Sequence, residues 1–487
     1  MVNNESKLKT IFSKNSYVWY VTAVVFMMFA NGKYIVPVAI WLGLVFSLRF
    51  TRERKPAAGY IIMVFTIALI YIFQWYDAWK VLPFFYLLPI TVGVFGALPF
   101  LIDRLLLKRY QGFLSVFVFP LVWTAGEFFN SFGVSASLGS LAYTQYGNLP
   151  LMQLVSITGL WGITFLITWF AAVVNYSWER QFEWQKIYRV VGVYVCVFAL
   201  IMIYGGTRLV FQNQKPGTVR IASVVVPGML AGFFEAIETK VVPSFDKSVQ
   251  ALTSYTNEAV KTGAEIILFH EYAFLIDANH EKAFTELAGE LAKKENIHLF
   301  LSLGVFGPSH GENKVLYFKP SGETGFEYLK FKPVMSVETP YITSGSQTGP
   351  TIDTPFGKIA TVICADLSYN HYIKSVGENG AGLLLGPSNE WKELVPWDTY
   401  MAVFRAIENG FSMVRANGEE GISIAVDPLG QTLSSMNSLV TNKRIMISDV
   451  PVKRVATLYS IVGELFGFLC MIGSGAIVGW AIVKRHT

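Results

Sequence analysis

Three residue types that can take part in acyl transfer close separate apolar runs in the second half of the chain. Glu271 closes AEIILFHE, Lys330 closes FEYLK, and Cys364 closes KIATVIC. Folds of the α/β class place their chemistry at strand ends. A thiolate can attack a carbonyl, a carboxylate can take and return the proton, and a fixed cation can stabilise the oxyanion. The ordered set therefore predicts covalent catalysis with Cys364 as the nucleophile.

Each of these residues is weak evidence when it is taken alone. A lone cysteine after a buried strand is usually a core residue, and a lone Glu or Lys at a strand end is usually solvated. The other two cysteines, Cys196 and Cys470, lie in apolar stretches. This set predicts no disulfide framework and no zinc site, and His270 lacks the further ligands that a metal would need. We therefore expect neither a metal nor an organic cofactor.

The elements around these residues indicate a separate α/β domain. Apolar β-rich runs cover residues 219–226, 265–269, 299–305, 359–363 and 382–385, and they alternate with helical segments. One predicted helix carries Phe284, Leu287 and Leu291 on one face and ends in Lys293 and Lys294.

The rest of the chain is apolar enough to be a membrane domain. Of 487 residues, 53% are hydrophobic and 15% charged, and a net charge of +5 without a basic run excludes a nucleic-acid partner. A spanning helix needs about 20 apolar residues. Eight such spans are predicted, at 16–32, 34–50, 57–76, 81–102, 113–132, 152–177, 188–206 and 457–482.

The cations predict the orientation of these spans, because Lys and Arg in short loops stay cytoplasmic. Lys7, Lys9 and Lys14 precede the first span, which we interpret as an anchor because six more spans follow. The loops on the same side carry Arg49, Arg52, Arg54, Lys55, Arg104, Lys108, Arg109, Arg180, Lys186 and Arg189, and the tail carries Lys484 and Arg485. We expect a membrane domain over 1–212, an extracytoplasmic catalytic domain over 213–455, and a last span with its cytoplasmic tail over 456–487.

Several motifs resemble a known superfamily. FHEYAF, YLKFKP, VICADL, RAIENG at 405–410 and VRANGEEGIS at 414–423 resemble the carbon-nitrogen hydrolase (nitrilase) superfamily. Seven spans before the domain and one after it resemble the apolipoprotein N-acyltransferase family within it. So do FPLVWTAGEFFNSFG from Phe119 and LPLMQLVSITGLWGITFLI from Leu149. The resemblance implies an αββα sandwich beside the helical membrane domain.

The resemblance also implies roles for single residues. Glu271 matches the general base, Lys330 the oxyanion-stabilising lysine, Cys364 the nucleophile that becomes a thioester, and Glu338 the second essential glutamate. The spacing to Glu338 favours Lys330 over Lys332 as the catalytic lysine. The implied substrates are a phospholipid donor, with phosphatidylethanolamine expected, and a diacylglyceryl lipoprotein acceptor. The implied location is the bacterial inner (cytoplasmic) membrane.

The chain departs from the family pattern after its cysteine. Ala365 and Asp366 stand where the family usually has an aromatic residue and Glu, which puts the shape of the acyl pocket in question. Trp391 and Trp397, in the loop PSNEWKELVPWD, are either rim aromatics or part of a lid over a lipid-using site.

Two carboxyl groups inside the predicted spans receive no assigned role. Carboxyls there are expensive and are usually paired, so Glu127 and Glu464 are expected to be hydrogen-bonding groups or interior-facing.

Two other functions remain open from the sequence. One is a membrane-tethered amidase or nitrilase-like hydrolase whose thioester is resolved by water. The other is a non-catalytic lipid-binding or scaffold protein that has kept the fold.

Overall fold

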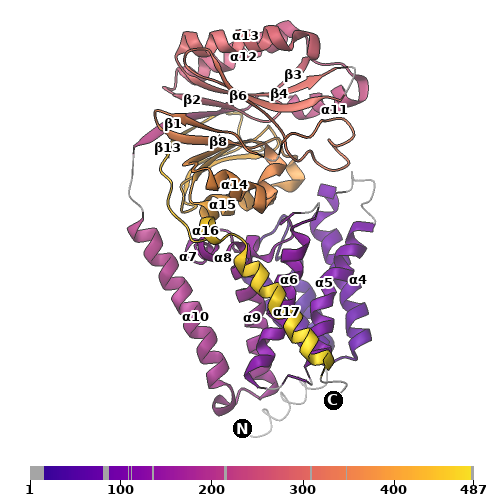
Figure 1. Cartoon of the computed structure of the whole chain (residues 1–487). Helices are drawn as coiled ribbons and strands as arrows, with labels where there is room; N and C mark the ends of the chain where they lie inside the picture. Colours follow the sequence, from indigo (N-terminus) through magenta and orange to yellow (C-terminus); the bar gives the residue numbers. More distant parts are fainter. Residues whose placement is uncertain are drawn as a thin grey trace. The chain divides into compact units, whose positions relative to one another are not determined.

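A computed structural model describes residues 16–483 except 80–86, 108, 111, 134–135, 213–216, 308–309 and 347. The chain divides into two compact units, whose helices and strands are labelled in Figure 1. One consists of the described residues up to Thr207 together with those from Glu464 onward, and the other is Arg208–Gly463. The cations at positions 7, 9, 14, 108, 484 and 485, and the start of the predicted fourth span, lie outside the described residues.

The first unit is helical, as expected for a multi-pass membrane protein. Among the described residues, six helical stretches are long and apolar enough to cross a membrane. These are α4 (Pro56–Trp79), α5 (Leu87–Leu106), η1 with α6 (Phe113–Asn130), α9 (Leu160–Glu179), α10 (Trp184–Phe211) and α17 (Leu465–Val483). The first two predicted spans correspond to the shorter helices α2 (Ser16–Met28) and α3 (Pro37–Arg52), so eight complete spans are not established.

Glycines divide two of the predicted spans. The stretch 152–177 contains α7 (Leu149–Met152), α8 (Val155–Thr158) and then α9, which begins after Gly159. The last span likewise begins as α16 (Tyr459–Val462) and resumes as α17 after Gly463. Gly159 and Gly463 have positive φ angles of 63° and 58°, which lie outside the helical range and which glycine adopts easily because it has no Cβ. The predicted continuous spans are therefore wrong at these two points.

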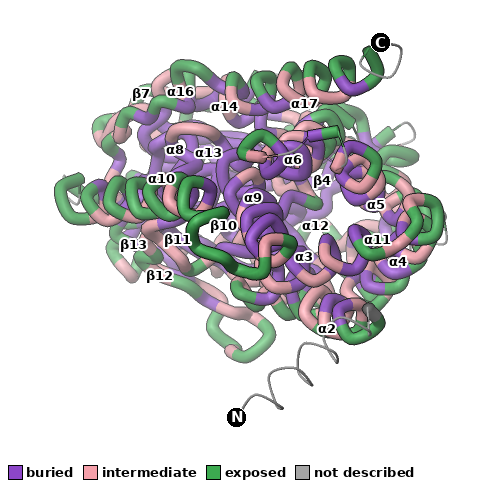
Figure 2. The backbone as a smooth tube through the Cα atoms, turned by 90° about the horizontal axis from the view of Figure 1, so that it is seen from below, coloured by how far each residue is buried: buried purple, intermediate pink, exposed green. Residues whose placement is uncertain are grey.

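Burial differs strongly among the helices of this unit. Figure 2 shows α9 mostly buried, whereas α10 and α17 carry long exposed stretches. Val210 and Ile472 on these two helices are 71% and 68% exposed. Apolar helix faces of this kind are suited to hydrocarbon.

The two carboxyl groups that lie inside predicted spans are both hydrogen-bonded. Glu127 accepts hydrogen bonds from Trp123 Nε1 at 2.9 Å and Thr164 Oγ1 at 2.8 Å, and also from Ser140 and the Leu141 backbone. Glu464 accepts a hydrogen bond from Trp161. The expectation that both carboxyls are hydrogen-bonded is confirmed.

The second unit contains two β-sheets, and the resemblance to an αββα sandwich is confirmed. One sheet has the order β13-β1-β2-β4-β5-β6, with β3 paired to β4. Its strands are β1 (Thr218–Val224), β2 (Ile266–Phe269), β3 (Phe274–Asp277), β4 (His298–Phe306), β5 (Glu312–Phe318), β6 (Thr324–Leu329) and β13 (Ile445–Pro451). The other has the order β12-β11-β10-β9-β8-β7. Its strands are β7 (Thr351–Thr354), β8 (Gly357–Thr361), β9 (Leu383–Pro387), β10 (Ser412–Ala416), β11 (Ile422–Val426) and β12 (Thr432–Asn437).

Helices form the outer layers of this unit. In Figure 1, α12 (Phe245–Val260) and α13 (Glu281–Glu295) cover one sheet, and α14 (Asn370–Glu378) and α15 (Trp397–Asn409) cover the other. Phe284 and Leu291 of α13 are buried in the core, and Leu287 packs against it, as the sequence predicts. The shorter α11 (Met229–Thr239) follows β1.

Parallel pairing brings several strand ends together. Strands β1, β2 and β4 run parallel in one sheet, and β8, β9 and β10 run parallel in the other. The carboxyl ends of the two sheets meet, because the backbone N–H of Glu271 donates to the carbonyl of Ser388 at 3.3 Å. This shared edge carries the candidate site.

A buried ion pair in the helical unit supplies a test of its stability. Arg52 donates two hydrogen bonds of 2.8 Å to Asp103, and both side chains are almost fully buried. We expect Arg52→Met to destabilise the protein by about 3–5 kcal/mol, because Asp103 would be left buried without its cation. Thermal unfolding in detergent measures this. Lys33→Met is the matched control, since Lys33 and Asp77 are exposed and 3.9 Å apart, and an equal loss in both variants would contradict the prediction.

Candidate active site

The ends of β2 and β6 place a carboxylate against an ammonium. Glu271 lies two residues beyond β2, and Lys330 follows β6 directly. Lys330 Nζ is 2.7 Å from Glu271 Oε1 and 2.6 Å from Glu338 Oε2. All three side chains are buried. The structure therefore brings together Glu271, Lys330 and Glu338, which the sequence analysis had grouped.

Three further donors fix the two carboxylates. Asn313 of β5 donates from Nδ2 to Glu271 Oε1 at 2.7 Å and to Glu338 Oε1 at 3.1 Å. The Tyr272 hydroxyl and the backbone N–H of Val334 also donate to Glu338. Asn313 was missed in the sequence analysis, and its position inside the buried strand ENKVLYF was the available signal.

Cys364 occupies a strained turn at the junction of β8 and η4 (Cys364–Ser368). Its φ is 45°, in the left-handed region that costs a residue with a Cβ roughly 1–3 kcal/mol. The side chain is partly buried. Backbone outliers of this kind are concentrated at active sites, where surrounding structure holds them in place.

Charges around the thiol favour its neutral form. Burial raises the pKa of Cys364 well above its ordinary value, and the neighbouring Glu271 carboxylate raises it further. Lys330 and Arg415 oppose this rise. A thiol that is neutral near pH 7 needs a base for attack, and a carboxylate lies beside it.

The lysine is held in its charged form. Burial alone would lower the pKa of Lys330, but Glu271 and Glu338 outweigh it and hold that pKa well above its ordinary value. Burial would raise the pKa of Glu338, and Lys330 reverses this effect and lowers it. The site therefore contains a permanent cation that could stabilise an oxyanion.

Asp366 braces the turn that carries Cys364. Its carboxylate accepts hydrogen bonds from the backbone N–H of Ile363 at 3.0 Å, the backbone N–H of Lys332 at 2.8 Å and the Tyr328 hydroxyl at 2.7 Å. The departure from the family pattern at this position thus leaves a carboxylate that ties the Cys364 turn to the segment after Lys330. Burial raises the pKa of Asp366 to about 6.

Arg415 is a second buried cation at this edge. It lies on β10, donates to Ser388 Oγ at 2.8 Å, and pairs with Glu390 and Asp398. Its partner Ser388 also accepts the Glu271 backbone N–H through its carbonyl. Arg415 belongs to the motif VRANGEEGIS, but its pairing with Glu390 and Asp398 was not predicted, because these partners lie in another segment that no spacing reveals.

Other residues singled out from the sequence lie around this group. The Lys332 ammonium lies over the rings of Phe331 and Tyr369, at 4.6 and 5.3 Å from their centres. Trp397 is buried at the start of α15, whereas Trp391 is half-buried in the loop before it. Of the two tryptophans, Trp391 is therefore the more accessible to a substrate.

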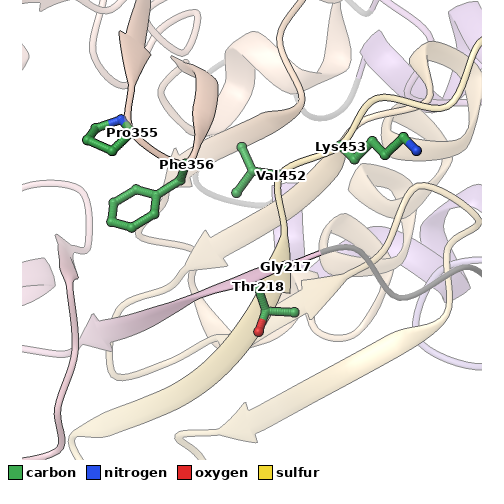
Figure 3. A pocket seen from close by; sticks show the side chains of 6 residues that line it. All are labelled: Gly217, Thr218, Pro355, Phe356, Val452 and Lys453. Atoms are coloured by element: carbon green, nitrogen blue, oxygen red, sulfur yellow. The ribbon is translucent and has the colours of Figure 1, made fainter.

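Two features lie away from the catalytic edge. Glu281, Glu312 and Glu327 gather closely enough to suggest a metal site, but all three carboxylates already contact the Lys314 ammonium. A pocket of about 450 Å³ is lined by Gly217, Thr218, Pro355, Phe356, Val452 and Lys453 (Figure 3). These residues lie where β1 and β8 begin, at the opposite ends of the strands from Cys364.

The brace made by Asp366 can be tested by substitution. Asp366→Asn would turn an NH2 group toward one of three donors, and an unsatisfied buried donor costs about 1–3 kcal/mol. We expect a lower melting temperature and faster alkylation of Cys364 by iodoacetamide, since the turn would loosen. Asp353→Asn, on the exposed part of β7, is the control. If the Asp366→Asn protein is less stable but Cys364 is alkylated at the parent rate, then Asp366 does not hold the turn that carries the thiol.

Comparison with known proteins covers both units. The carbon-nitrogen hydrolase model matches residues 221–459, and the model of the apolipoprotein N-acyltransferase N-terminal domain matches residues 21–173. The apolipoprotein N-acyltransferase of Geobacter metallireducens is 23% identical over 452 residues, covering 82% of this chain and 84% of the relative. That of Pasteurella multocida is 23% identical over 491 residues and covers 90% of each chain.

A relative from the wider superfamily matches only part of the chain. A probable nitrilase of Schizosaccharomyces pombe is 26% identical over 219 residues, which is 39% of this chain and 78% of that protein. The acyltransferases, in contrast, align across both units, and one family model is specific to their N-terminal domain. The chain therefore belongs to the apolipoprotein N-acyltransferase family, within the carbon-nitrogen hydrolase superfamily.

Proposed function

We propose that this protein transfers an acyl chain from a phospholipid, through a thioester on Cys364, to the amine of a diacylglyceryl-cysteine at the N-terminus of a lipoprotein. The buried Glu271–Lys330–Glu338 cluster beside Cys364 carries the proposal. The apolar helices of the first unit support membrane-bound substrates.

The first half-reaction forms the thioester. Cys364 Sγ attacks the carbonyl of the sn-1 ester while Glu271 takes the thiol proton and Lys330 stabilises the oxyanion. When the intermediate collapses, the ester C–O bond breaks and Glu271 returns the proton to the leaving oxygen. A lysophospholipid departs. Phosphatidylethanolamine is the donor we expect.

The second half-reaction consumes the thioester. The acceptor amine attacks the thioester carbonyl, Glu271 removes a proton from the amine, and Lys330 again stabilises the oxyanion. The C–S bond breaks, the thiol regains a proton, and an amide is released. Both lipids use one nucleophile in turn, which predicts ping-pong kinetics. Glu338 positions Lys330 throughout, and Trp391 is the proposed substrate contact in the loop before α15.

A membrane-tethered hydrolase is the alternative function. It would use Glu271, Lys330 and Cys364 in the same way, but water would hydrolyse the thioester. We favour the transferase because both of its proposed substrates carry acyl chains. Burying each CH₂ of such a chain contributes about 0.8 kcal/mol, and a site at the bilayer can use this free energy to recognise both lipids.

Trapping the acyl-enzyme tests the proposal. With phospholipid labelled in the sn-1 chain, we expect a hydroxylamine-sensitive adduct on Cys364 by mass spectrometry. Cys364→Ala should abolish the adduct, because it removes the sulfur that carries the acyl chain. Glu271→Gln and Lys330→Met should each reduce its formation about 100-fold or more, because each removes a group that acts at the reacting centre. Cys196→Ala and Cys470→Ala are matched controls and should leave it unchanged.

The acceptor then distinguishes transferase from hydrolase. A diacylglyceryl-cysteinyl peptide should discharge the label into an amide, whereas the same peptide with an acetylated N-terminus should not. A thioester that drains to free fatty acid equally fast without peptide would establish the hydrolase instead.

The orientation of the catalytic domain is a second prediction. The chain is proposed to lie in the bacterial cytoplasmic membrane with residues 213–455 outside, because Arg49, Arg104, Arg180 and their neighbouring cations mark the opposite loops as cytoplasmic. A reporter fused near residue 300 should be active outside the cytoplasm, and one fused near residue 182 should be active inside. The reverse pattern would contradict this topology.

A further inference from the structure

A buried amide at the catalytic edge has no partner of its own. Asn389 is 7% exposed, and neither Oδ1 nor Nδ2 makes a hydrogen bond to any residue that the structure describes. Most buried side-chain polar atoms are paired, and leaving a donor or acceptor unsatisfied costs about 1–3 kcal/mol. An amide kept in this state calls for a functional explanation.

Asn389 stands beside the reacting groups. Ser388, the residue before Asn389, accepts a hydrogen bond of 2.8 Å from Arg415 Nε, and Arg415 is one of the two cations that act on the Cys364 thiol. The Ser388 carbonyl receives the Glu271 backbone N–H. Asn389 is the next residue after this junction between the thiol and the base.

A glycine and a histidine border the same space. A Cβ at Gly418 would lie 2.0 Å from Asn389 Oδ1 and 3.5 Å from His270 Nδ1, so a side chain there would collide with the amide. Burial lowers the pKa of His270 to about 4, and the ring is therefore neutral near pH 7. Its Nε2 lies 3.0 Å from the Val226 carbonyl, which can only accept, so Nε2 carries the proton and Nδ1 is an acceptor.

Three polar atoms of these two side chains have no hydrogen-bond partner among the described residues: Asn389 Oδ1 and His270 Nδ1, which are hydrogen-bond acceptors, and Asn389 Nδ2, which is a donor. The reacting ester of a phospholipid presents only acceptors. An N-terminal residue presents amine and amide N–H donors together with a peptide carbonyl. The N-terminal residue of the lipoprotein, which accepts the acyl chain, therefore matches these polar atoms better than the phospholipid ester does.

We infer that Asn389, with His270 beside it, binds the backbone of the N-terminal residue of the acceptor during the second half-reaction. This inference rests on the proposed function. It makes Asn389 a specificity residue for a lipidated peptide with a free N-terminus.

Measuring the two half-reactions separately distinguishes a role in binding the acceptor peptide from a structural role. Asn389→Leu keeps the approximate volume but loses both hydrogen-bonding groups. Acylation of Cys364 by labelled phospholipid should stay within about twofold of the parent. Discharge by the diacylglyceryl-cysteinyl peptide should fall about tenfold or more, and discharge by hydroxylamine, which has no peptide group, should not change. Asn379→Leu, on the exposed end of α14, is the matched control.

A change in the substrate completes the test. Replacing the first peptide bond of the acceptor by an ester should slow discharge in the parent and have little further effect in Asn389→Leu. If Asn389→Leu does not fold, Asn389→Ala removes the same two hydrogen-bonding groups without adding bulk or charge, and it should show the same division between half-reactions.

Two outcomes would overturn the inference while the proposed function stands. These are unchanged peptide discharge in Asn389→Leu, or an equal slowing of acylation, peptide discharge and hydroxylamine discharge. If the parent itself forms no thioester, the proposed function fails and this inference fails with it.

Discussion

The buried ammonium of Lys330 is the constraint on which the active-site edge depends. Removing an ammonium from water costs several kcal/mol, and only close carboxylates with further hydrogen bonds compensate for this. Glu271 and Glu338 meet the requirement from two sides, and Asn313 joins them. The end of β2, the end of β6, the following loop and the start of β5 must therefore converge on one point. The sandwich supplies the rigid strands that hold them there.

The same edge imposes opposite protonation states on neighbouring groups. Carboxylates keep Lys330 charged, whereas burial and the Glu271 carboxylate keep the Cys364 thiol neutral. A neutral thiol beside a base is ready to give up its proton only as it attacks. The positive charges of Arg415 and Lys330 lower the pKa of the Cys364 thiol and so limit the rise that the carboxylates cause.

Sequence reasoning located the groups that lie at strand ends and missed those that lie within strands. Glu271, Lys330 and Cys364 each close an apolar run, so their order was visible. Asn313 precedes the apolar part of β5 and Arg415 interrupts that of β10, and their partners come from distant segments that no spacing reveals. The breaks at Gly159 and Gly463 were also hidden, because hydropathy continues across them while backbone geometry does not.

Strand β5 serves two charge clusters placed back to back. Asn313 joins the two catalytic carboxylates, and Lys314, one residue later, joins three glutamates. Successive side chains of a strand point to opposite faces, so a shift of one residue would exchange the two. The uncharged amide would then meet Glu281 and Glu327, and a second ammonium would enter the catalytic cluster. Insertions and deletions within this strand are thus disfavoured, and changes in length are better placed in the loops beside it, such as the β5–β6 turn at Ser321 and Gly322.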